Sequence, residues 1–276
     1  MYARILGPLA ITSGSVDLTP RAPKQRQLLS LLLLHAGQVV TVDECVDELW
    51  EAGPPRSAHS TLQTYIMQIR KILAGVRAEG GDGPAAPLGL ETRDRGYCLT
   101  VGPDALDLHR FERLTEQAAV ARAAGEHGAE ASLLQRALGL WSGRALADVQ
   151  CGPLLRTQLS GLHEVWLGAV EQRIDADLRT GRHHRLIPEL RVLTHQYPRH
   201  ENLHAQLMIA LYRSGRPSEA LQVYARLRTV FAEELGLDPS EQLRDLQRRL
   251  LGAGPVAESV YLPAPGAVRE QLPLAG

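Results

Sequence analysis

The chain has 276 residues, of which 44% are hydrophobic and only 4% aromatic, so we expect one large or two moderate domains with cores built mainly from Leu, Ala and Val. Its formal net charge of −1 gives no general support for nucleic-acid binding, and any basic surface must be local. The 3 cysteines form no Cys-x-x-Cys pair, which argues against a disulfide framework and a cysteine zinc site. No apolar run reaches the ~18 residues of a membrane span, so we expect a cytoplasmic protein and not a membrane protein.

The chain begins with short extended segments. Residues 2–11 are apolar and are interrupted by Gly7-Pro8, and residues 16–18 form a second candidate strand, which together predict a small antiparallel sheet. The leucine-rich segment 25–36 predicts a central helix that ends at Gly37, because glycine adopts the left-handed conformation that terminates helices. A brief strand is expected next.

Residues 42–50, VDECVDELW, predict a second helix, since acidic residues in the first turn favour a helix N-terminus. The side chains expected inside are Val42, Val46, Leu49 and Trp50, and those expected outside are Asp43, Glu44, Asp47 and Glu48. The acidic side is either an ordinary solvated face or a contact for a basic partner protein.

Residues 54–73 predict a third helix, which starts after Pro54-Pro55 with Ser57 as its N-cap. An apolar stripe consists of Leu62, Ile66, Ile69 and Leu73, and the opposite face carries Ser60, Gln63, Thr64, Met67, Gln68 and Lys71. No acidic residue occurs between Ala52 and Ala78. Such a face suits a DNA major groove, although by itself it could equally be a solvated surface.

Residues 79–87 predict a flexible loop, and residues 88–101 predict a two-stranded hairpin with Arg93 and Arg95 near its tip. Sheet, helix, helix, helix and hairpin, in this order, predict a winged helix whose third helix enters the major groove and whose hairpin is the wing. Positive charge gathers at Lys24, Arg26 and Arg56 and again at the wing.

After residue 106 helical periodicity dominates. Candidate helices cover residues 108–124, 129–141, 155–180, 183–196, 200–214, 217–235 and 239–251. Residues 178–182, LRTGR, match residues 212–216, YRSGR, at an offset of 34 residues, which is the period of tetratricopeptide helix pairs. Gly181 and Gly215 are expected to end the first helix of each pair. A plain helical bundle that supports the first domain is the alternative.

Longer motifs show a resemblance to a known family. Residues 24–26, DELW with Pro54-Pro55, STLQTYIMQIRKIL and Arg95-Gly96-Tyr97 resemble OmpR-type winged-helix effector domains. Residues 137–149, 207–221 and 232–251 resemble the bacterial transcriptional activation domain. The order is similar to that of a small Streptomyces antibiotic regulatory protein. We therefore expect a mainly α protein with a winged-helix domain over residues 1–102, a tetratricopeptide-like domain over 103–252 and a disordered tail over 253–276.

The resemblance implies a transcriptional activator of an antibiotic gene cluster. It would bind direct repeats of promoter DNA near the −35 region as two protomers, at the nucleoid, and contact the sigma factor and the alpha and beta-type subunits of RNA polymerase. The residues expected at DNA are Lys24, Arg26, Arg56, Ser60, Thr61, Thr64, Tyr65, Gln68, Arg70, Lys71, Arg93 and Arg95. Tyr65 could instead belong partly to the core, and Arg70 could pair with an acid.

No catalytic or cofactor site is expected. The sequence holds no Gly-x-Ser-x-Gly and no Walker A loop, and the adjacent His183 and His184 point in different directions on a helix, so a histidine metal cluster is disfavoured. An adaptor whose winged helix binds only protein is the alternative function. Control by a ligand in the helical groove is a third possibility, for which the sequence names no ligand.

Overall fold

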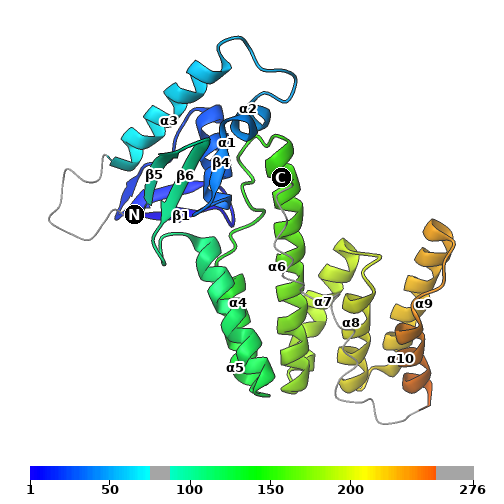
Figure 1. Cartoon of the computed structure of the whole chain (residues 1–276). Helices are drawn as coiled ribbons and strands as arrows, with labels where there is room; N and C mark the ends of the chain where they lie inside the picture. Colours follow the sequence, from blue (N-terminus) through cyan, green and yellow to red (C-terminus); the bar gives the residue numbers. More distant parts are fainter. Residues whose placement is uncertain (75–87, 253–276) are drawn as a thin grey trace. The chain divides into compact units, whose positions relative to one another are not determined.

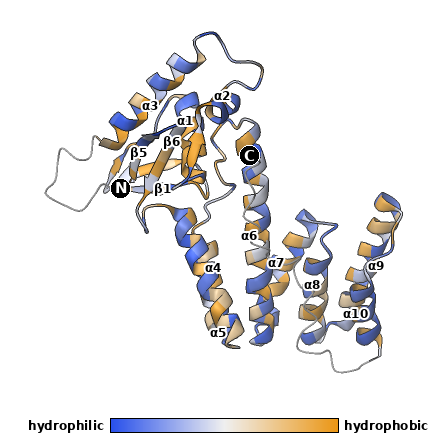
Figure 2. Cartoon of the chain, in the orientation of Figure 1, coloured by the Kyte–Doolittle hydropathy of each residue, from blue (hydrophilic) through white to orange (hydrophobic). Residues whose placement is uncertain are grey.

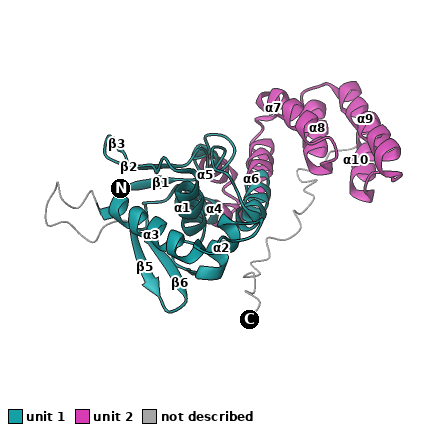
Figure 3. Cartoon of the chain, turned by 90° about the horizontal axis from the view of Figure 1, so that it is seen from above, with its two compact units in different colours: residues 1–117, 135–167 teal, residues 118–134, 168–276 magenta. Residues whose placement is uncertain are grey.

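The computed structural model describes residues 1–74 and 88–252, so the predicted loop at 79–87 and the predicted tail lie outside the described residues. The chain divides into two compact units, residues 1–117 with 135–167 and residues 118–134 with 168–276 (Figure 3). The described part is mainly α-helical with two small antiparallel sheets, as the sequence predicted (Figure 1). None of its helices is long and apolar enough to cross a membrane.

The first unit begins with the predicted sheet, which contains β1 (Tyr2–Arg4), β2 (Ala10–Ser13) and β3 (Val16–Asp17) in that order. Its central register pairs Ala3 with Ile11, and both side chains are buried. Residues 103–106, which the sequence suggests only as a short link between the two halves of the chain, also pair with this sheet, because the Ala3 N–H donates to the Ala105 carbonyl at 2.7 Å.

Three helices form the core of the winged helix, namely α1 (Pro23–Leu34), α2 (Val42–Leu49) and α3 (Ala58–Ala74). The leucines of α1 up to Leu33 are buried, which confirms its central place. Thr41 caps α2, since its side chain accepts from the Glu44 N–H at 3.2 Å while the Glu44 carboxylate accepts from the Thr41 N–H at 2.7 Å.

The second sheet carries the wing. It contains β4 (Val39–Thr41), β6 (Gly96–Val101) and β5 (Leu88–Arg93), with β6 in the middle. Gly96 must be glycine, because a Cβ atom there would lie 2.0 Å from the Val40 carbonyl oxygen. The close approach explains the glycine of the Arg-Gly-Tyr sequence in the hairpin, and the predicted winged helix is confirmed.

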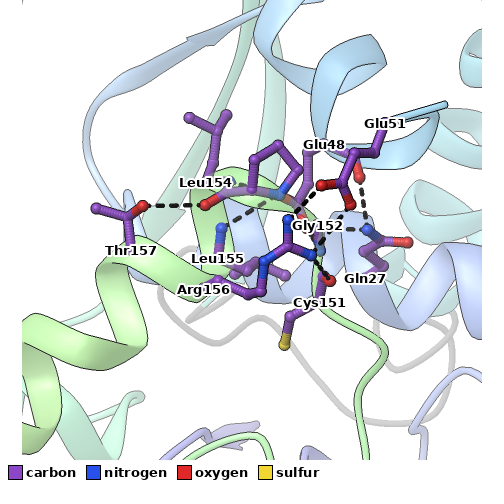
Figure 4. Close-up of polar contacts among 10 residues, drawn as sticks. Gln27, Glu48, Glu51, Cys151, Gly152, Leu154, Leu155, Arg156 and Thr157 are labelled. Atoms are coloured by element: carbon purple, nitrogen blue, oxygen red, sulfur yellow. Dashed lines mark hydrogen bonds and ion pairs between the residues drawn. The ribbon is translucent and has the colours of Figure 1, made fainter. Parts of the chain in front are cut away.

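One assignment in α2 was wrong. Glu48 was expected on the outer face, but it is only 1% exposed. Figure 4 shows its hydrogen bonds with residues at the start of the next long helix. Its carboxylate accepts from the N–H groups of Gly152 at 2.6 Å, Leu154 at 3.0 Å and Leu155 at 3.1 Å. Glu48 therefore caps the N-terminus of α6 (Pro153–Arg179), where free N–H groups and the helix dipole favour a negative charge.

Other groups also pack closely around Glu48. The Gln27 side-chain amide donates to the same carboxylate at 2.9 Å, and a Cβ atom on Gly152 would lie 2.2 Å from the Glu48 carbonyl oxygen. Trp50, which was expected inside α2, lies at its C-cap and is only half-buried.

Two more carboxylates bind the N-terminal segment. The Asp107 carboxylate accepts from the N–H groups of Ile5 and Leu6 at 2.9 Å, and that of Asp148 accepts from the Leu9 N–H at 2.8 Å. Burial raises the pKa of Asp107, and its hydrogen bonds to backbone N–H groups act against this effect. The first unit thus includes residues beyond 102, and the domain boundary drawn from the sequence stays a prediction.

The helices α4 (Asp107–Ala123), α5 (His127–Leu138) and α6 contribute residues to both units. The second unit continues with α7 (His183–Gln196), α8 (Glu201–Arg213), α9 (Pro217–Leu235) and α10 (Glu241–Leu251). Gly181 has φ +77° and Gly215 has φ +73°, so both predicted helix ends are confirmed.

The second unit stacks as the repeat predicts, since α8 packs against both α7 and α9. A polar anchor joins α8 to α6, where the buried Glu171 carboxylate accepts from the Asn202 amide at 2.6 Å and the Gln206 amide donates to the Glu171 carbonyl at 2.9 Å.

Candidate nucleic-acid interface

The third helix separates apolar and polar residues onto two faces. Leu62, Ile66, Ile69 and Leu73 are buried in the winged helix as predicted. The opposite face is solvent-exposed, and Figure 2 shows hydrophilic residues along it. Its exposed side chains are Ser60, Gln63, Thr64, Met67 and Lys71. Ser57 lies at the predicted N-cap position, just before the first helical residue, Ala58, and its carbonyl accepts from the Thr61 N–H at 2.9 Å.

Two hydroxyl groups on this face bond to the helix itself. Ser60 donates to the Ser57 carbonyl at 2.9 Å, and Thr64 donates to the Ser60 carbonyl at 3.0 Å. Each hydroxyl proton is thus engaged, which leaves the oxygen lone pairs and the methyl group of Thr64 for an external partner.

The middle of the helix is only half-exposed. Thr61, Tyr65 and Gln68 are all partly buried, which fits the expectation that Tyr65 shares its surface with the core. The side-chain amide of Gln25 in α1 donates a hydrogen bond to the side-chain oxygen of Gln68. The Gln68 oxygen that accepts this bond has a second lone pair, and the NH2 group of Gln68 is a separate donor, so the bond does not by itself prevent bidentate pairing with a base.

Arg70 does not pair with an acid in the described part of the chain. Its guanidinium donates to the Leu90 carbonyl at 3.1 Å and to the Thr92 hydroxyl at 2.7 Å, both in β5. Arg70 therefore joins the third helix to the wing and fixes the distance between the two parts expected to contact DNA. The helix pattern placed Arg70 away from the centre of the exposed face, but it gave no indication of this partner.

Three of the cations predicted to contact DNA have no side-chain partner within the described residues. Within residues 1–74 and 88–252, the exposed side chains of Arg56, Lys71 and Arg95 make no hydrogen bond or ion pair. Arg93, also exposed, pairs with Glu91 on the same strand at 2.6 Å. An exposed pair of this kind is weak, so phosphate can replace the carboxylate at small cost.

Two of the predicted cations are engaged within the first unit. Lys24 donates to the carbonyl of Leu49 at the end of α2, where a cation is favoured by the helix dipole. The Arg26 guanidinium pairs with Asp148, and its side chain is 17% exposed. Both residues contribute to the structure, and a phosphate contact from Arg26 would have to compete with this pair.

The described residues hold no cluster of three or more side chains that could bind a metal ion. Burial raises the pKa of the Cys45 thiol to about 12, which leaves it protonated and unreactive. The second unit contains a cavity of about 560 Å³ between α7, α8 and α9, with both charged and apolar walls. Its lining includes Arg191, His195, His204, Leu207, Val223 and Arg226.

The geometry of the first unit suits duplex DNA. A helix presents hydroxyls, amides and a cation, and a hairpin fastened to it by Arg70 presents two more cations. Side chains of these types pair with base edges and phosphates.

Two family models match the chain. Residues 15–99 match the transcriptional regulatory protein C-terminal family, and residues 106–251 match the bacterial transcriptional activator domain. The chain is 45% identical to the regulatory protein DnrI of Streptomyces peucetius, over 92% of this chain and 93% of DnrI. It is 42% identical to AfsR of Streptomyces griseus over 90% of this chain, but spans only 24% of AfsR.

A solved structure is also similar. The structure of Mycobacterium tuberculosis EmbR, in complex with a low-affinity phosphopeptide, matches with a TM-score of 0.86 and 32% identity. The match covers 93% of this chain and 66% of EmbR. The winged helix followed by a helical domain is therefore an arrangement that this chain shares with a known regulator.

Proposed function

Because the chain belongs to the Streptomyces antibiotic regulatory protein family of transcriptional regulators, we propose that it activates a secondary-metabolite gene cluster by binding specific promoter DNA. The observation that carries the proposal is the exposed face of α3, which holds no acidic residue and is joined to the wing by Arg70. Lys71 on α3 and Arg56 before it have no carboxylate partner in the described part of the chain.

The contacts divide by role. In this proposal α3 lies in the major groove, where Ser60, Thr61, Thr64, Tyr65 and Gln68 face base edges. Arg56 and Lys71 neutralise phosphates beside it, and Arg93 and Arg95 reach the adjacent backbone or minor groove from the wing.

The finer part of the proposal concerns the promoter. Two protomers bind direct repeats near the −35 region, and the helical domain contacts the sigma factor and the alpha and beta-type subunits of RNA polymerase. The cavity between α7, α8 and α9 supports a role in protein contacts, because stacked helix pairs present concave surfaces to partners.

A titration with salt separates DNA binding from the adaptor function. The affinity of the full chain for a duplex selected from random sequences is measured at rising KCl concentration. Each neutralised phosphate should contribute about 0.9 to the negative slope of log K against log salt. A slope of several units supports the proposal, whereas no enrichment of any duplex and a slope near zero would favour the adaptor.

Footprinting on promoters that contain the selected sequence tests the finer part. We expect the chain alone to protect two adjacent repeats. When polymerase is added, the protected region should extend over the −35 element. Protection of a single site that polymerase does not extend would contradict the paired binding and the recruitment.

A further inference from the structure

The exposed face of α3 carries an apolar side chain that the DNA contacts above do not use. Met67 is 62% exposed, whereas the apolar residues of the opposite stripe are at most 4% exposed. It lies midway between the phosphate-facing cation Lys71 and the hydroxyl of Thr64 along the helix. Burial of a large apolar group in the centre of a polar recognition surface is most favourable where the bound partner is also apolar, because no polar group of the partner then loses its water.

Thr64 extends this apolar spot. Residues three apart on a helix are neighbours on its surface, so Thr64 and Met67 lie side by side. The Thr64 hydroxyl donates its proton to the Ser60 carbonyl at 3.0 Å, and both side chains are exposed. The methyl group of Thr64 and the thioether chain of Met67 therefore form a small apolar patch, which we call the Met67 patch.

The major groove offers one apolar group on the base edges, the C5-methyl group of thymine. The flexible, polarisable methionine side chain adapts well to such a contact. Resting on the proposed function, we propose that the Met67 patch contacts a thymine methyl group and that Met67 is a specificity-determining residue at that base pair.

Deoxyuridine gives a direct test, because it differs from thymidine only by the methyl group and keeps the base pairing and the O4 acceptor. The full chain selects its preferred duplex from random sequences, and each thymine of that duplex is then replaced singly by deoxyuridine. Loss of one buried methyl group should weaken binding about four-fold at one position. In Met67→Gln the two duplexes should bind equally, and in Met67→Leu the difference should return.

Val120→Ala is the matched control, since Val120 is an exposed apolar residue of α4, outside the proposed DNA surface. This variant should discriminate thymine from uracil as the wild type does. The inference is overturned if no thymine replacement weakens binding by more than about two-fold, or if the loss persists unchanged in Met67→Gln. Failure of the wild type to enrich any duplex would instead overturn the proposed function.

Discussion

At the scale of single residues, Glu48 has the largest predicted effect on stability. Glu48→Ala removes the acceptor of three backbone N–H groups at the start of α6 and leaves two of them buried and one partly buried. We expect the free energy of unfolding to fall by about 3 kcal/mol, because buried donors without partners cost about 1–3 kcal/mol each and part of that cost is relieved by water. Urea unfolding followed by circular dichroism measures the change.

Asp47 provides the control for Glu48, as it is an acidic residue of the same helix with an exposed side chain. Asp47→Ala should change the unfolding free energy by less than about 0.5 kcal/mol. Equal losses in the two variants would show that the effect belongs to the charge of α2 and not to the cap on α6.

We expect the stability of the second unit to depend on pH through His204. Burial lowers the pKa of His204 below its ordinary value of 6.5, while the hydrogen bond to the His200 carbonyl acts in the opposite direction. The unfolded chain then binds the proton more readily than the folded one, so the stabilisation is complete above pH 6.5 and is lost as the pH falls below it.

The variant His204→Gln cannot titrate and should show a shallower loss of stability between neutral pH and the folded-state pKa. Chemical unfolding at a series of pH values gives the comparison. If wild type and variant lose stability in parallel, another group carries the pH dependence.

The sequence could not predict the long-range partners of Glu48 or Arg26, for the same reason. A helical wheel ranks the faces of one helix, whereas the partners of Glu48 lie in residues 152–155 and that of Arg26 is Asp148, more than a hundred residues away in the chain. Periodicity contains no information about contacts of this range.

At the scale of elements, α3 carries two kinds of cation: one that we expect to bind phosphate, and one that joins the helix to the wing. Lys71→Ala removes an exposed cation with no partner in the described residues, so the salt slope should fall by about 0.9. Arg70→Ala removes the bonds from α3 to β5 and should weaken binding with a smaller change of slope. Fluorescence anisotropy over a range of salt concentrations distinguishes them, and equal slope changes would contradict the assignment.

The start of α6 is a second test at this scale. Gly152→Ala should destabilise the fold, because its Cβ atom would lie 2.2 Å from the Glu48 carbonyl oxygen. Gly161→Ala, inside α6 with open space around it, should be neutral or stabilise the fold by up to about 1 kcal/mol. Thermal unfolding of both variants checks this, and a stabilising Gly152→Ala would contradict the close packing of α2 on α6.

The positions of individual helices could be predicted most accurately from the sequence. The helices α7 and α9 coincide with the predicted ranges, since proline, glycine and apolar periodicity mark both ends and the buried face of each. The pairing of residues 103–106 with the first strand was not predicted, because short extended segments carry no signal that names their partner.

At the scale of the whole molecule, the first unit extends beyond the winged helix. A fragment of residues 1–102 lacks Asp107 and Asp148, which accept backbone N–H groups of the segment between β1 and β2, and the helix start that Glu48 caps. We expect its melting temperature to lie at least about 10 °C below that of the first transition of the full chain. Calorimetry provides the comparison, and equal melting temperatures would show that the winged helix folds independently of these contacts.

The central claim is that the exposed face of α3 reads DNA sequence, and the specificity ratio tests it most directly. This ratio compares the affinity of the full chain for its selected duplex with that for a scrambled duplex at the same salt concentration. In the double variant Thr64→Ala, Gln68→Ala, the ratio should fall at least about ten-fold while affinity for the scrambled duplex stays the same, because each lost base contact costs about 1–3 kcal/mol. An unchanged ratio would contradict the assignment of α3 as the recognition helix.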